Sequence, residues 1–474
     1  MKHLETADLP KVAPNGPAGG SSLTGDPAPG LVLVYSAGQP TFAAVSLGAA
    51  PLVLGREGEG VFPLHDATMS RRHAEVRREG GVWRVRDLGS RNGTFVDGAP
   101  ADGAIAYDDP TLLRLGDTLF LFTEDLRRFT GTSIERRGDG MVVGPTLRES
   151  WARIEGARDA EALHLSGESG CGKELFATGF HTLGPNPGGP FVAVNCATIP
   201  ETLAERLLFG AKKGAFSGAD KDVEGFLAAA SGGTLFLDEV AELDLNVQAK
   251  LLRVLETHEV LPLGSTKSVK VDVRVVSATH RGLRAQVAQG KFREDLYFRM
   301  GRPEVAIPPL RDRLEEVPWL VHLELGKLGV RAHVSLLETC LLRPWPGNVR
   351  ELLSEVRTSG REALGLQRSV LDANGLSSTA GMAFGQVAHP SAAAIARLET
   401  TPPSQPAGVE KARSQGRTPN AEELTQALQQ FEGNVARTAR ALGVHRTQLR
   451  RWLERYALDP ARFAPPGTTR DGGE

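Results

Sequence analysis

Short apolar runs alternate with turn residues from about residue 31 to residue 125. Stretches such as LVLVY, FAAVSL, WRVRDL and TLFLF are separated by glycine, aspartate and asparagine. Runs of β-branched, aromatic and other apolar residues that are bounded in this way are typical of β-strands. Many short strands at this spacing predict an all-β sandwich for this part of the chain.

A different pattern follows between about residues 141 and 365. Strand-like runs such as ALHLS, FVAVN, TLFLD and VRVVSA alternate with helical patterns such as VQAKLLRVLETH. Strands that are separated by helices usually pair in parallel. The pattern therefore predicts an α/β domain with a largely parallel sheet between flanking helices.

Helical periodicity returns between about residues 420 and 458. Breaks at Gly433-Asn434 and at Gly443 divide this segment into three short helices. Apolar residues recur where a three-helix core needs them, at Leu424, Leu428, Val435, Ala439, Leu442, Val444, Leu449 and Leu453. We therefore expect a small all-α domain at this end of a multidomain chain.

Two segments have the composition of connecting or disordered chain. Residues 1–30 are rich in Pro, Gly, Ser and Thr, and residues 366–417 are rich in Ala, Ser, Pro and Gly. Chain with few large apolar residues cannot offset the entropy that ordering costs. We therefore predict a disordered leader at residues 1–30 and a flexible linker at residues 366–417.

Composition excludes several classes of protein. The formal net charge is −2 over 474 residues, so any surface that binds nucleic acid must be local. Three cysteines, far apart in the chain, make neither a disulfide framework nor a four-cysteine metal site. No run approaches the roughly 20 apolar residues of a membrane span, and the first residues lack a signal-peptide core. We expect a cytoplasmic protein that does not bind membranes.

A glycine-rich loop joins the strand-like run ALHLS to the helical run ELFATGFHTL. Its residues are Gly167, Glu168, Ser169, Gly170, Cys171, Gly172, Lys173 and Glu174. In a loop of this kind the backbone amides cradle phosphates and the lysine reaches the β- and γ-phosphates. Glu174 replaces the usual Mg²⁺-binding Ser or Thr, so a simple glycine-rich turn is the alternative interpretation.

Two adjacent carboxylates follow the apolar run TLFL about sixty residues later. Asp238 would hold Mg²⁺, while Glu239 would polarise the water that attacks the γ-phosphate. A buried strand that ends in solvated acids is the alternative. Because both motifs follow strands in the order that an ATPase requires, we predict ATP and Mg²⁺ as ligands.

The stretch from about residue 141 to 370 resembles the AAA+ domain of sigma-54-dependent activators, the bacterial enhancer-binding proteins. The matching runs are GESGCGKE, FVAVNCA, VQAKLLRVLE, FREDLYFRM, PPLRDR and WPGNVREL. The resemblance implies a P-loop ATPase with a helical lid that assembles into a homo-oligomeric ring, expected to be a hexamer. It also makes Glu174 the family's ordinary residue, although Cys171 stands where threonine is common.

The resemblance implies roles for four further residues. Asn195 would couple the catalytic glutamate to the phosphate state. Arg293 and Arg299 would reach the nucleotide of the neighbouring subunit, and Arg350 would report loss of the γ-phosphate from the lid. Each arginine, taken singly, is more commonly explained by a surface ion pair.

Residues 214–219, GAFSGA, resemble the family's GAFTGA loop, which contacts sigma-54. The resemblance assigns contact with sigma-54 or promoter DNA to Phe216 and Ser217; the alternative for Phe216 is packing in the core. Three features depart from the family: Ser217 replaces threonine, the flank LLFGAKK replaces ELFGHEK, and His280 replaces the asparagine of sensor I. A second candidate is therefore a DNA-binding regulator whose AAA+ domain oligomerises with ATP without engaging sigma-54.

Cationic and hydroxyl side chains gather on turns of the N-terminal sandwich. Such donors suit a dianionic phosphate. The runs GR, SRRH and DLGSRNGT resemble the forkhead-associated (FHA) domain, which binds phosphothreonine peptides. The resemblance implies that Arg56 and Ser70 bind the phosphate, that Arg71 and Arg91 line the rim, and that Asn92 holds the peptide backbone. The expected partner is a phosphothreonine-containing protein or a Ser/Thr kinase.

The last predicted helix is strongly basic. The segment from residue 421 to 458 resembles the Fis-type helix-turn-helix that ends this activator family. Arginine and glutamine on such a helix can contact base edges and phosphates. The residues expected to contact enhancer-like DNA are His445, Arg446, Thr447, Gln448, Arg450 and Arg451. Sigma-54 RNA polymerase is the remaining partner that the resemblance implies.

Overall fold

The computed structural model describes residues 28–383, except positions 49, 59–60, 102, 138–139 and 216–219. It also describes positions 424, 425, 428, 429, 438, 453 and 456. The predicted leader, most of the predicted linker and most of the predicted third domain lie outside these residues. The chain divides into two compact units, residues 1–400 and 401–474. None of the described helices is long and apolar enough to cross a membrane.

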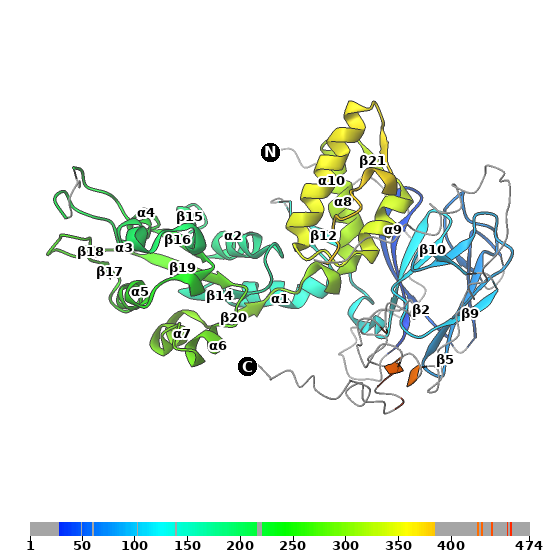
Figure 1. Ribbon diagram of the computed structural model, residues 1–474, viewed down its shortest axis with the longest axis horizontal. Coiled ribbons are helices and arrows are strands. Elements are labelled where there is room, and N and C mark those ends of the chain that lie inside the picture. Colours follow the sequence, from blue (N-terminus) through cyan, green and yellow to red (C-terminus); the bar gives the residue numbers. More distant parts are fainter. Residues whose placement is uncertain are drawn as a thin grey trace. The chain divides into compact units, whose positions relative to one another are not determined.

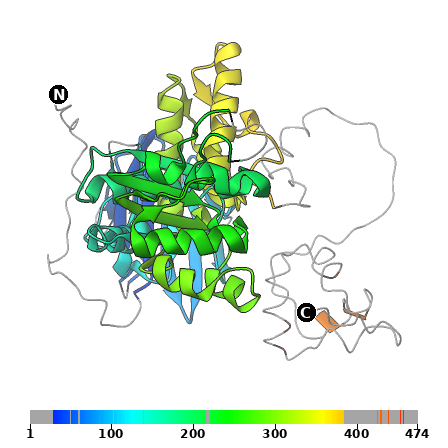
Figure 2. The same cartoon turned by 90° about the vertical axis from the view of Figure 1, so that its left-hand side faces the viewer.

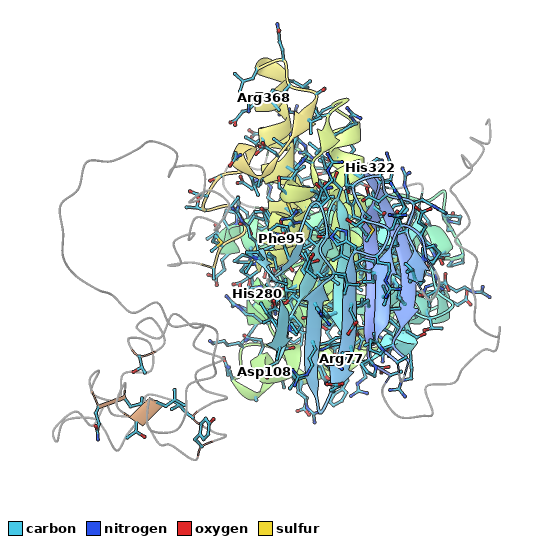
Figure 3. The ribbon with its side chains drawn as sticks, turned by 90° about the vertical axis from the view of Figure 1, so that its right-hand side faces the viewer. Arg77, Phe95, Asp108, His280, His322 and Arg368 are labelled. Carbon is cyan, nitrogen blue, oxygen red and sulfur yellow. The ribbon has the colours of Figure 1, made fainter. Side chains whose placement is uncertain are left out.

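The first part of the chain forms two sheets that pack face to face, which confirms the predicted sandwich (Figures 1 and 3). One sheet has the order β2-β1-β11-β10-β7-β8, formed by Gln39–Ser46, Gly30–Ser36, Thr118–Thr123, Leu112–Leu115, Thr94–Val96 and Ala99–Pro100. The other has the order β4-β3-β5-β6-β9, formed by Val61–Pro63, Leu52–Gly55, Ala74–Glu79, Val82–Asp87 and Ala104–Tyr107. Leu33, Trp83 and Phe120 are buried in the core between the two sheets.

The second part is an α/β domain around a five-stranded sheet, as predicted (Figure 2). The order is β15-β16-β19-β14-β20, formed by Phe191–Asn195, Gly233–Asp238, Val273–Thr279, Ala162–Ser166 and Glu304–Ala306. Every pair of neighbouring strands is parallel. Its helices are α1 (Pro145–Gly156), α2 (Lys173–Leu183), α3 (Glu201–Phe209), α4 (Phe226–Ala229), α5 (Leu245–Thr257), α6 (Leu283–Ala288) and α7 (Glu294–Met300).

Side chains of the central strands alternate between two cores, one on each face of the sheet. Phe236 packs with residues of α1 and α2, whereas Leu235 and Leu237 pack with residues of α3, α5 and α7. A parallel sheet that is covered on both faces needs apolar residues at consecutive positions. The run TLFL meets this need and places the carboxylates that follow it at the carboxyl edge of the sheet.

A helical lid follows the sheet. It consists of α8 (Val317–Gly326), α9 (Val334–Leu342) and α10 (Asn348–Gly365), with a parallel pair of β21 (Arg331–Ala332) and β22 (Val370–Leu371). Trp345 is buried between α9 and α10, where its indole Nε1 donates a hydrogen bond to the Cys340 carbonyl at 2.7 Å. The remaining short elements are η1 (Leu126–Arg128), β12 (Glu135–Arg136), β13 (Val142–Val143), η2 (Cys196–Thr198), η3 (Val240–Glu242), β17 (Glu259–Val260), β18 (Val269–Lys270), η4 (Leu310–Asp312), η5 (Leu314–Glu316) and η6 (Ala373–Gly375).

The structure corrects the predicted start of the linker at residue 366. Leu371 pairs with Ala332 across the two short strands, and it is buried with Leu376 and Ala380 against the lid. The Gly381 carbonyl also accepts a hydrogen bond from the Trp345 amide at 2.9 Å. These apolar residues follow neither helical nor strand spacing, and the composition around them is that of a linker. The sequence pattern therefore did not indicate that they are buried. Residues 366–383 are therefore part of the lid.

In the second unit, three residues that the pattern assigns to the core are buried. They are Leu424, Leu428 and Leu453. Apolar side chains are buried where helices pack against one another, so this burial agrees with the predicted all-α domain.

A buried ion pair joins the lid to the α/β domain. The Arg313 guanidinium lies 2.7 Å from the Glu316 carboxylate and donates to the Cys171 carbonyl at 2.6 Å. The other Glu316 oxygen accepts from the Gly144 amide at 2.7 Å, directly before α1. Burial raises the pKa of Glu316 to about 7, although Arg313 acts in the opposite direction. Because both charges are buried, each needs the other as its partner. The contacts with Cys171 and Gly144 therefore stabilise the packing of these segments together.

We expect Arg313→Met to destabilise the chain by about 3–5 kcal/mol, because it leaves the Glu316 carboxyl buried without its partner. The matched control is Arg153→Met, which removes an exposed pair with Glu149 on α1 and should cost less than about 1 kcal/mol. Denaturant unfolding of the two variants measures the difference. Equal losses would show that the Arg313 pair adds nothing beyond a surface contact.

Candidate functional site

The glycine-rich loop lies between β14 and α2, where its backbone conformation depends on glycine. Gly170 has a φ of 76°, and a Cβ there would lie 2.2 Å from the Gly347 carbonyl oxygen of the lid. Gly172 caps the N-terminus of α2 with a φ of 108°. Left-handed backbone of this kind strains any residue with a side chain. The loop is therefore a tight turn that leads into a helix N-terminus, as a phosphate cradle requires.

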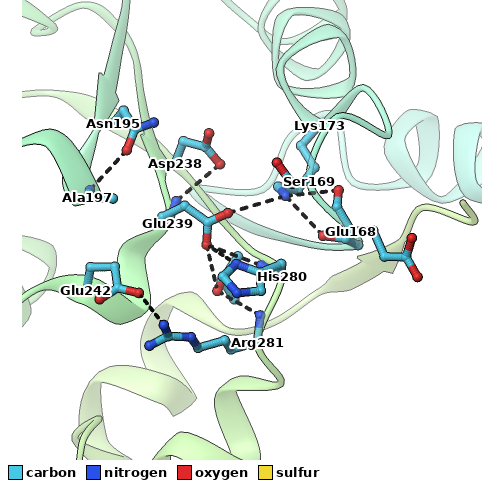
Figure 4. A network of polar contacts seen from close by, with 12 residues as sticks. Glu168, Ser169, Lys173, Asn195, Ala197, Asp238, Glu239, Glu242, His280 and Arg281 are labelled. Carbon is cyan, nitrogen blue, oxygen red and sulfur yellow. Dashed lines mark hydrogen bonds and ion pairs between the residues drawn. The ribbon is translucent and has the colours of Figure 1, made fainter. Parts of the chain in front are cut away.

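Lys173 crosses the mouth of this loop and is only 7% exposed (Figure 4). Its Nζ donates to the carbonyls of Gly167 at 3.0 Å and Glu168 at 3.3 Å. The same nitrogen lies 3.7 Å from an oxygen of Glu239. A buried ammonium group requires opposite charge nearby, and a phosphate in the loop would supply it.

Strand β16 ends at Asp238, and Glu239 follows it directly, beside the lysine. The Glu239 amide donates to the Asp238 carboxylate at 3.1 Å, and Glu239 has a left-handed backbone with a φ of 52°. Burial raises the pKa of Asp238, although the nearby Lys173 lowers it. Mg²⁺ in nucleotide sites takes one or two carboxylates and fills its other positions with phosphate oxygens and water. One half-buried carboxylate beside the loop fits that pattern.

His280 holds Glu239 in this structure (Figure 4). One Glu239 oxygen is 2.7 Å from His280 Nδ1 and accepts from the backbone amide of His280 at 3.3 Å. Burial alone would raise the pKa of Glu239, but the hydrogen bond from His280 and the charge of Lys173 hold that pKa below its usual value. Glu239 is therefore kept as a carboxylate.

Asn195, by contrast, is not paired with Glu239 in this structure. Its side-chain oxygen accepts from the Ala197 amide at 3.0 Å and so caps the short helix η2. The expected coupling of Asn195 to the catalytic glutamate is therefore not made here. The residue that contacts Glu239 is His280, which the sequence marks as a departure from the family but which we did not predict as a site residue.

The lid and the short element η4 that precedes it contact the loop through residues that we did not predict. Arg311 donates to both oxygens of Glu168 at 2.8 and 2.7 Å, and this pair lowers the pKa of Glu168. Asn348 at the start of α10 donates to the same carboxylate at 3.1 Å. Arg311 lies in the run PPLRDR and Asn348 in the run WPGNVREL. The sequence therefore marked the two motifs but not the contacts that these two residues make. Arg350, a predicted residue, lies 3.3 Å from the Ser169 hydroxyl.

Arg293 and Arg299 lie away from the loop and are 40% and 44% exposed. Arg293 pairs with Asp295 at 2.7 Å, and Arg299 donates to the Leu255 carbonyl at 2.9 Å. Arg299 lines a pocket of about 230 Å³ with Glu161 and other residues. Among the described residues neither arginine is paired with Lys173, Asp238 or Glu239.

The predicted phosphopeptide residues gather on loops of the sandwich. The Ser70 hydroxyl accepts from the Arg91 amide at 3.0 Å, and Asn92 donates to the Thr68 carbonyl at 2.6 Å. Buried His73 supports these loops, because its ring contacts the Ser70 amide and the Gly93 carbonyl. The side chains of Arg56, Arg71 and Arg91 remain exposed. The loops therefore present their cations to solvent from a fixed backbone.

Some of the predicted contact residues lie outside the described residues. Phe216 and Ser217 fall in the gap at positions 216–219, although the base of their loop is described. Lys212 and Asp222 join the two sides of that base with an ion pair of 2.7 Å. The predicted DNA-contacting residues, His445, Arg446, Thr447, Gln448, Arg450 and Arg451, also lie outside the described part.

Three family models match the chain in succession. An FHA domain matches residues 52–121, a sigma-54 interaction domain matches residues 145–306, and a bacterial regulatory protein domain of the Fis family matches residues 420–456. This order and these assignments are the ones that the sequence motifs predict. The domain that carries the glycine-rich loop is therefore a AAA+ P-loop ATPase domain.

Relatives resemble the chain over part of its length. Transcriptional regulatory protein GlrR of Escherichia coli K12 is 38% identical over 319 residues, which is 66% of each chain. A Nif-specific regulatory protein of Azotobacter vinelandii is 46% identical over 45% of this chain and 43% of its own length. The crystal structure of NtrX from Brucella abortus in complex with ATP is 30% identical over 68% of this chain and 70% of that one, with a TM-score of 0.47. The chain spans about two thirds or less of the length of these curated relatives.

We expect His280→Ala to raise the pKa of Glu239, because the variant removes a hydrogen bond to the carboxylate. A base must be ionised to act, so the rate of ATP hydrolysis should begin to fall at a higher pH in the variant as the solution is acidified. Single-turnover hydrolysis as a function of pH measures this. Arg281→Ala is the control, because Arg281 pairs with Glu242 instead. An unchanged acid limb for His280→Ala would contradict the role of the histidine.

Proposed function

Because this chain belongs to the sigma-54-dependent activators, we propose that it binds upstream DNA, assembles into a ring and hydrolyses ATP to remodel sigma-54 RNA polymerase into the open complex. The observation that carries this proposal is the convergence of Lys173, Asp238 and Glu239 on one phosphate-binding loop at the sheet edge. An FHA domain in the same chain supports regulation by a phosphothreonine signal.

Hydrolysis needs a held phosphate and an activated water. Loop amides and Lys173 bind the phosphates, and Glu239 accepts the proton of the water that attacks the γ-phosphorus as the bond to the β–γ bridging oxygen breaks. The products are ADP and inorganic phosphate. Mg²⁺, held by Asp238, would neutralise charge on the phosphate oxygens. Arg350 and the contacts of Glu168 with the lid make lid position sensitive to the state of the loop.

Two arginines, one directly before α7 and one within it, support a ring. Arg293 and Arg299 are exposed, and their partners in this structure are Asp295 and the Leu255 carbonyl and not residues of their own nucleotide loop. By exchanging these surface contacts they would reach the nucleotide of a neighbouring subunit. An arginine supplied by another subunit stabilises charge on the transferred phosphoryl group. We propose a ring on this basis, a hexamer as the resemblance to the family implies, with hydrolysis confined to the assembled form.

The remaining partners follow from the other modules. Phe216 and Ser217 would contact sigma-54 from a loop whose base is closed by Lys212 and Asp222. The Fis-family domain would place its basic helix on enhancer-like DNA through the residues predicted above. Arg56, Ser70, Arg71, Arg91 and Asn92 would bind a phosphothreonine-containing protein, modified by a Ser/Thr kinase. All of these partners meet in the cytoplasm.

The central prediction concerns Glu239→Gln, which keeps the shape of the side chain but removes the base. We expect the rate of ATP hydrolysis to fall about 100-fold or more, and we expect no open complexes. The assay combines purified protein, sigma-54 polymerase, ATP and a genomic fragment that the protein itself selects. Glu242→Gln is the control, three residues away and paired with Arg281.

Phe216→Ala separates this function from that of a DNA-bound regulator that does not engage sigma-54. We expect the variant to hydrolyse ATP without opening the promoter. Open complexes that survive Glu239→Gln would overturn the remodelling mechanism. If the wild-type protein hydrolyses ATP and binds DNA but opens no sigma-54 promoter, the second candidate replaces the first.

We further expect Arg56→Ala to weaken binding of phosphothreonine peptides by about 10- to 100-fold, the loss of a hydrogen bond to a charged group. Titration with a degenerate phosphothreonine peptide pool measures the affinity, with the unphosphorylated pool as reference. Arg77→Ala is the control, because this exposed arginine lies on β5 and pairs with Glu79. Equal affinities for all three proteins would show that the phosphate is bound elsewhere.

A further inference from the structure

The outer face of one FHA sheet packs against the lid. Strand β1 alternates between two cores: Leu31 and Leu33 point into the sandwich, whereas Val32 and Val34 belong to the core that contains the lid helices. Strand β2 contacts α8, and strands β10 and β11 contact α9. An antiparallel sheet commonly leaves one face to water, so burial of the second face marks an interface between the domains.

Two polar contacts fix the register of this interface. The Tyr35 hydroxyl donates to the Ala332 carbonyl of the lid at 3.1 Å. Arg114 of β10 lies 3.0 Å from the Glu338 carboxylate of α9. The two charged side chains are 18% and 13% exposed, so solvent screens this pair less than a surface pair.

Arg114 also contacts a strand that directly follows one of the phosphopeptide loops. Its guanidinium stacks on the ring of Phe95 at 3.7 Å from the centroid, and Phe95 lies in β7 (Figure 3). Asn92 lies two residues before Thr94, the first residue of this strand. Movement of the loop that holds Asn92 would therefore act on a side chain that is paired with the lid.

A chain of hydrogen bonds joins the same loops to the lid by a second route. Asn92 donates to the Thr68 carbonyl, and the Thr68 hydroxyl donates to Asp66 at 2.7 Å. The other oxygen of Asp66 accepts from the Thr118 hydroxyl at 2.7 Å. Thr118 in turn lies 2.9 Å from the hydroxyl of Ser36, the residue after Tyr35.

The opposite side of the lid contacts the nucleotide loop. The start of α10 supplies Asn348 to Glu168 and Arg350 to Ser169. The Arg350 amide also lies 3.3 Å from the Gly170 carbonyl. The lid therefore stands between the two candidate sites and touches residues of both domains.

We propose that the FHA domain and the lid move as one body, so that phosphothreonine binding and nucleotide binding alter each other's affinity through this interface. The inference rests on the proposed function of the two sites and adds the physical link between them. Coupling between two sites is reciprocal by thermodynamic necessity. Packed contacts alone do not demonstrate coupling, so the test measures both affinities.

The experiment uses the full chain with Glu239→Gln to prevent hydrolysis. Affinity for the degenerate phosphothreonine peptide pool is measured without nucleotide and with saturating ATP, and affinity for ATP is measured with and without peptide. We expect both ratios to change by the same factor of about five or more. Arg114→Glu should reduce that factor towards one, and the double variant Arg114→Glu/Glu338→Arg should restore it.

Two further variants guard against effects of folding. Tyr35→Phe removes only the hydroxyl that bonds Ala332 and should lower the coupling factor while both ligands still bind. The exchange Arg153→Glu/Glu149→Arg reverses an exposed ion pair on α1 and should leave the factor unchanged.

The outcomes separate this inference from the proposed function. If both ligands bind the parent protein but neither affects the other, the coupling is refuted and the proposed function stands. If the double exchange fails to restore coupling that Arg114→Glu has removed, the ion pair is not the link. If no phosphothreonine peptide binds, the proposed regulation and the inference fail together.

Discussion

Lys173 sets the central constraint on the ATPase domain, because its buried ammonium group needs negative charge and fixed oxygens around it. Loop carbonyls surround it on one side and Glu239 lies on the other. Parallel strands bring both sources to the same edge of the sheet, since the loop follows β14 and Glu239 directly follows β16. A phosphate that enters the loop would compete for the lysine and release Glu239 from this pair. Fold topology and charge therefore set the state of the site together.

The lid packs against the FHA sheet on one side and contacts the nucleotide loop on the other. Its helices pack on the outer face of the FHA sheet, and the start of α10 bonds the nucleotide loop through Asn348. A packed apolar interface deforms little, so displacement at one side is transmitted as movement of the whole element. The buried pair of Arg313 and Glu316 adds a third attachment beside the segment that leads into α1. The proposed regulation by the N-terminal domain thus needs no long linker to carry a signal.

Periodicity and motif order predicted the sandwich, the parallel sheet and the residues of the loop, because each depends on local pattern. The sequence could not show that Val32 and Val34 pack against the lid, since a run of consecutive apolar residues does not indicate which element it contacts. It also could not place Arg311 on Glu168 or His280 on Glu239, because those pairs join segments more than forty residues apart. Residues 366–383 escaped for a related reason: their few apolar side chains have no periodic spacing.

His280 gives the resting arrangement of the site a specific cause. Asn195 is used as a helix cap, and Glu239 is held by the histidine ring, the neighbouring amide and Thr279. A carboxylate with that many donors is a weaker base than a free one, because hydrogen bonds to the charged form stabilise it. We propose that activation includes a step that frees Glu239 from these donors. Lys173 contacts both Glu239 and the loop carbonyls, and the lid bonds the loop through Asn348. Binding of a nucleotide in the loop and movement of the lid are therefore the two changes that can supply that step.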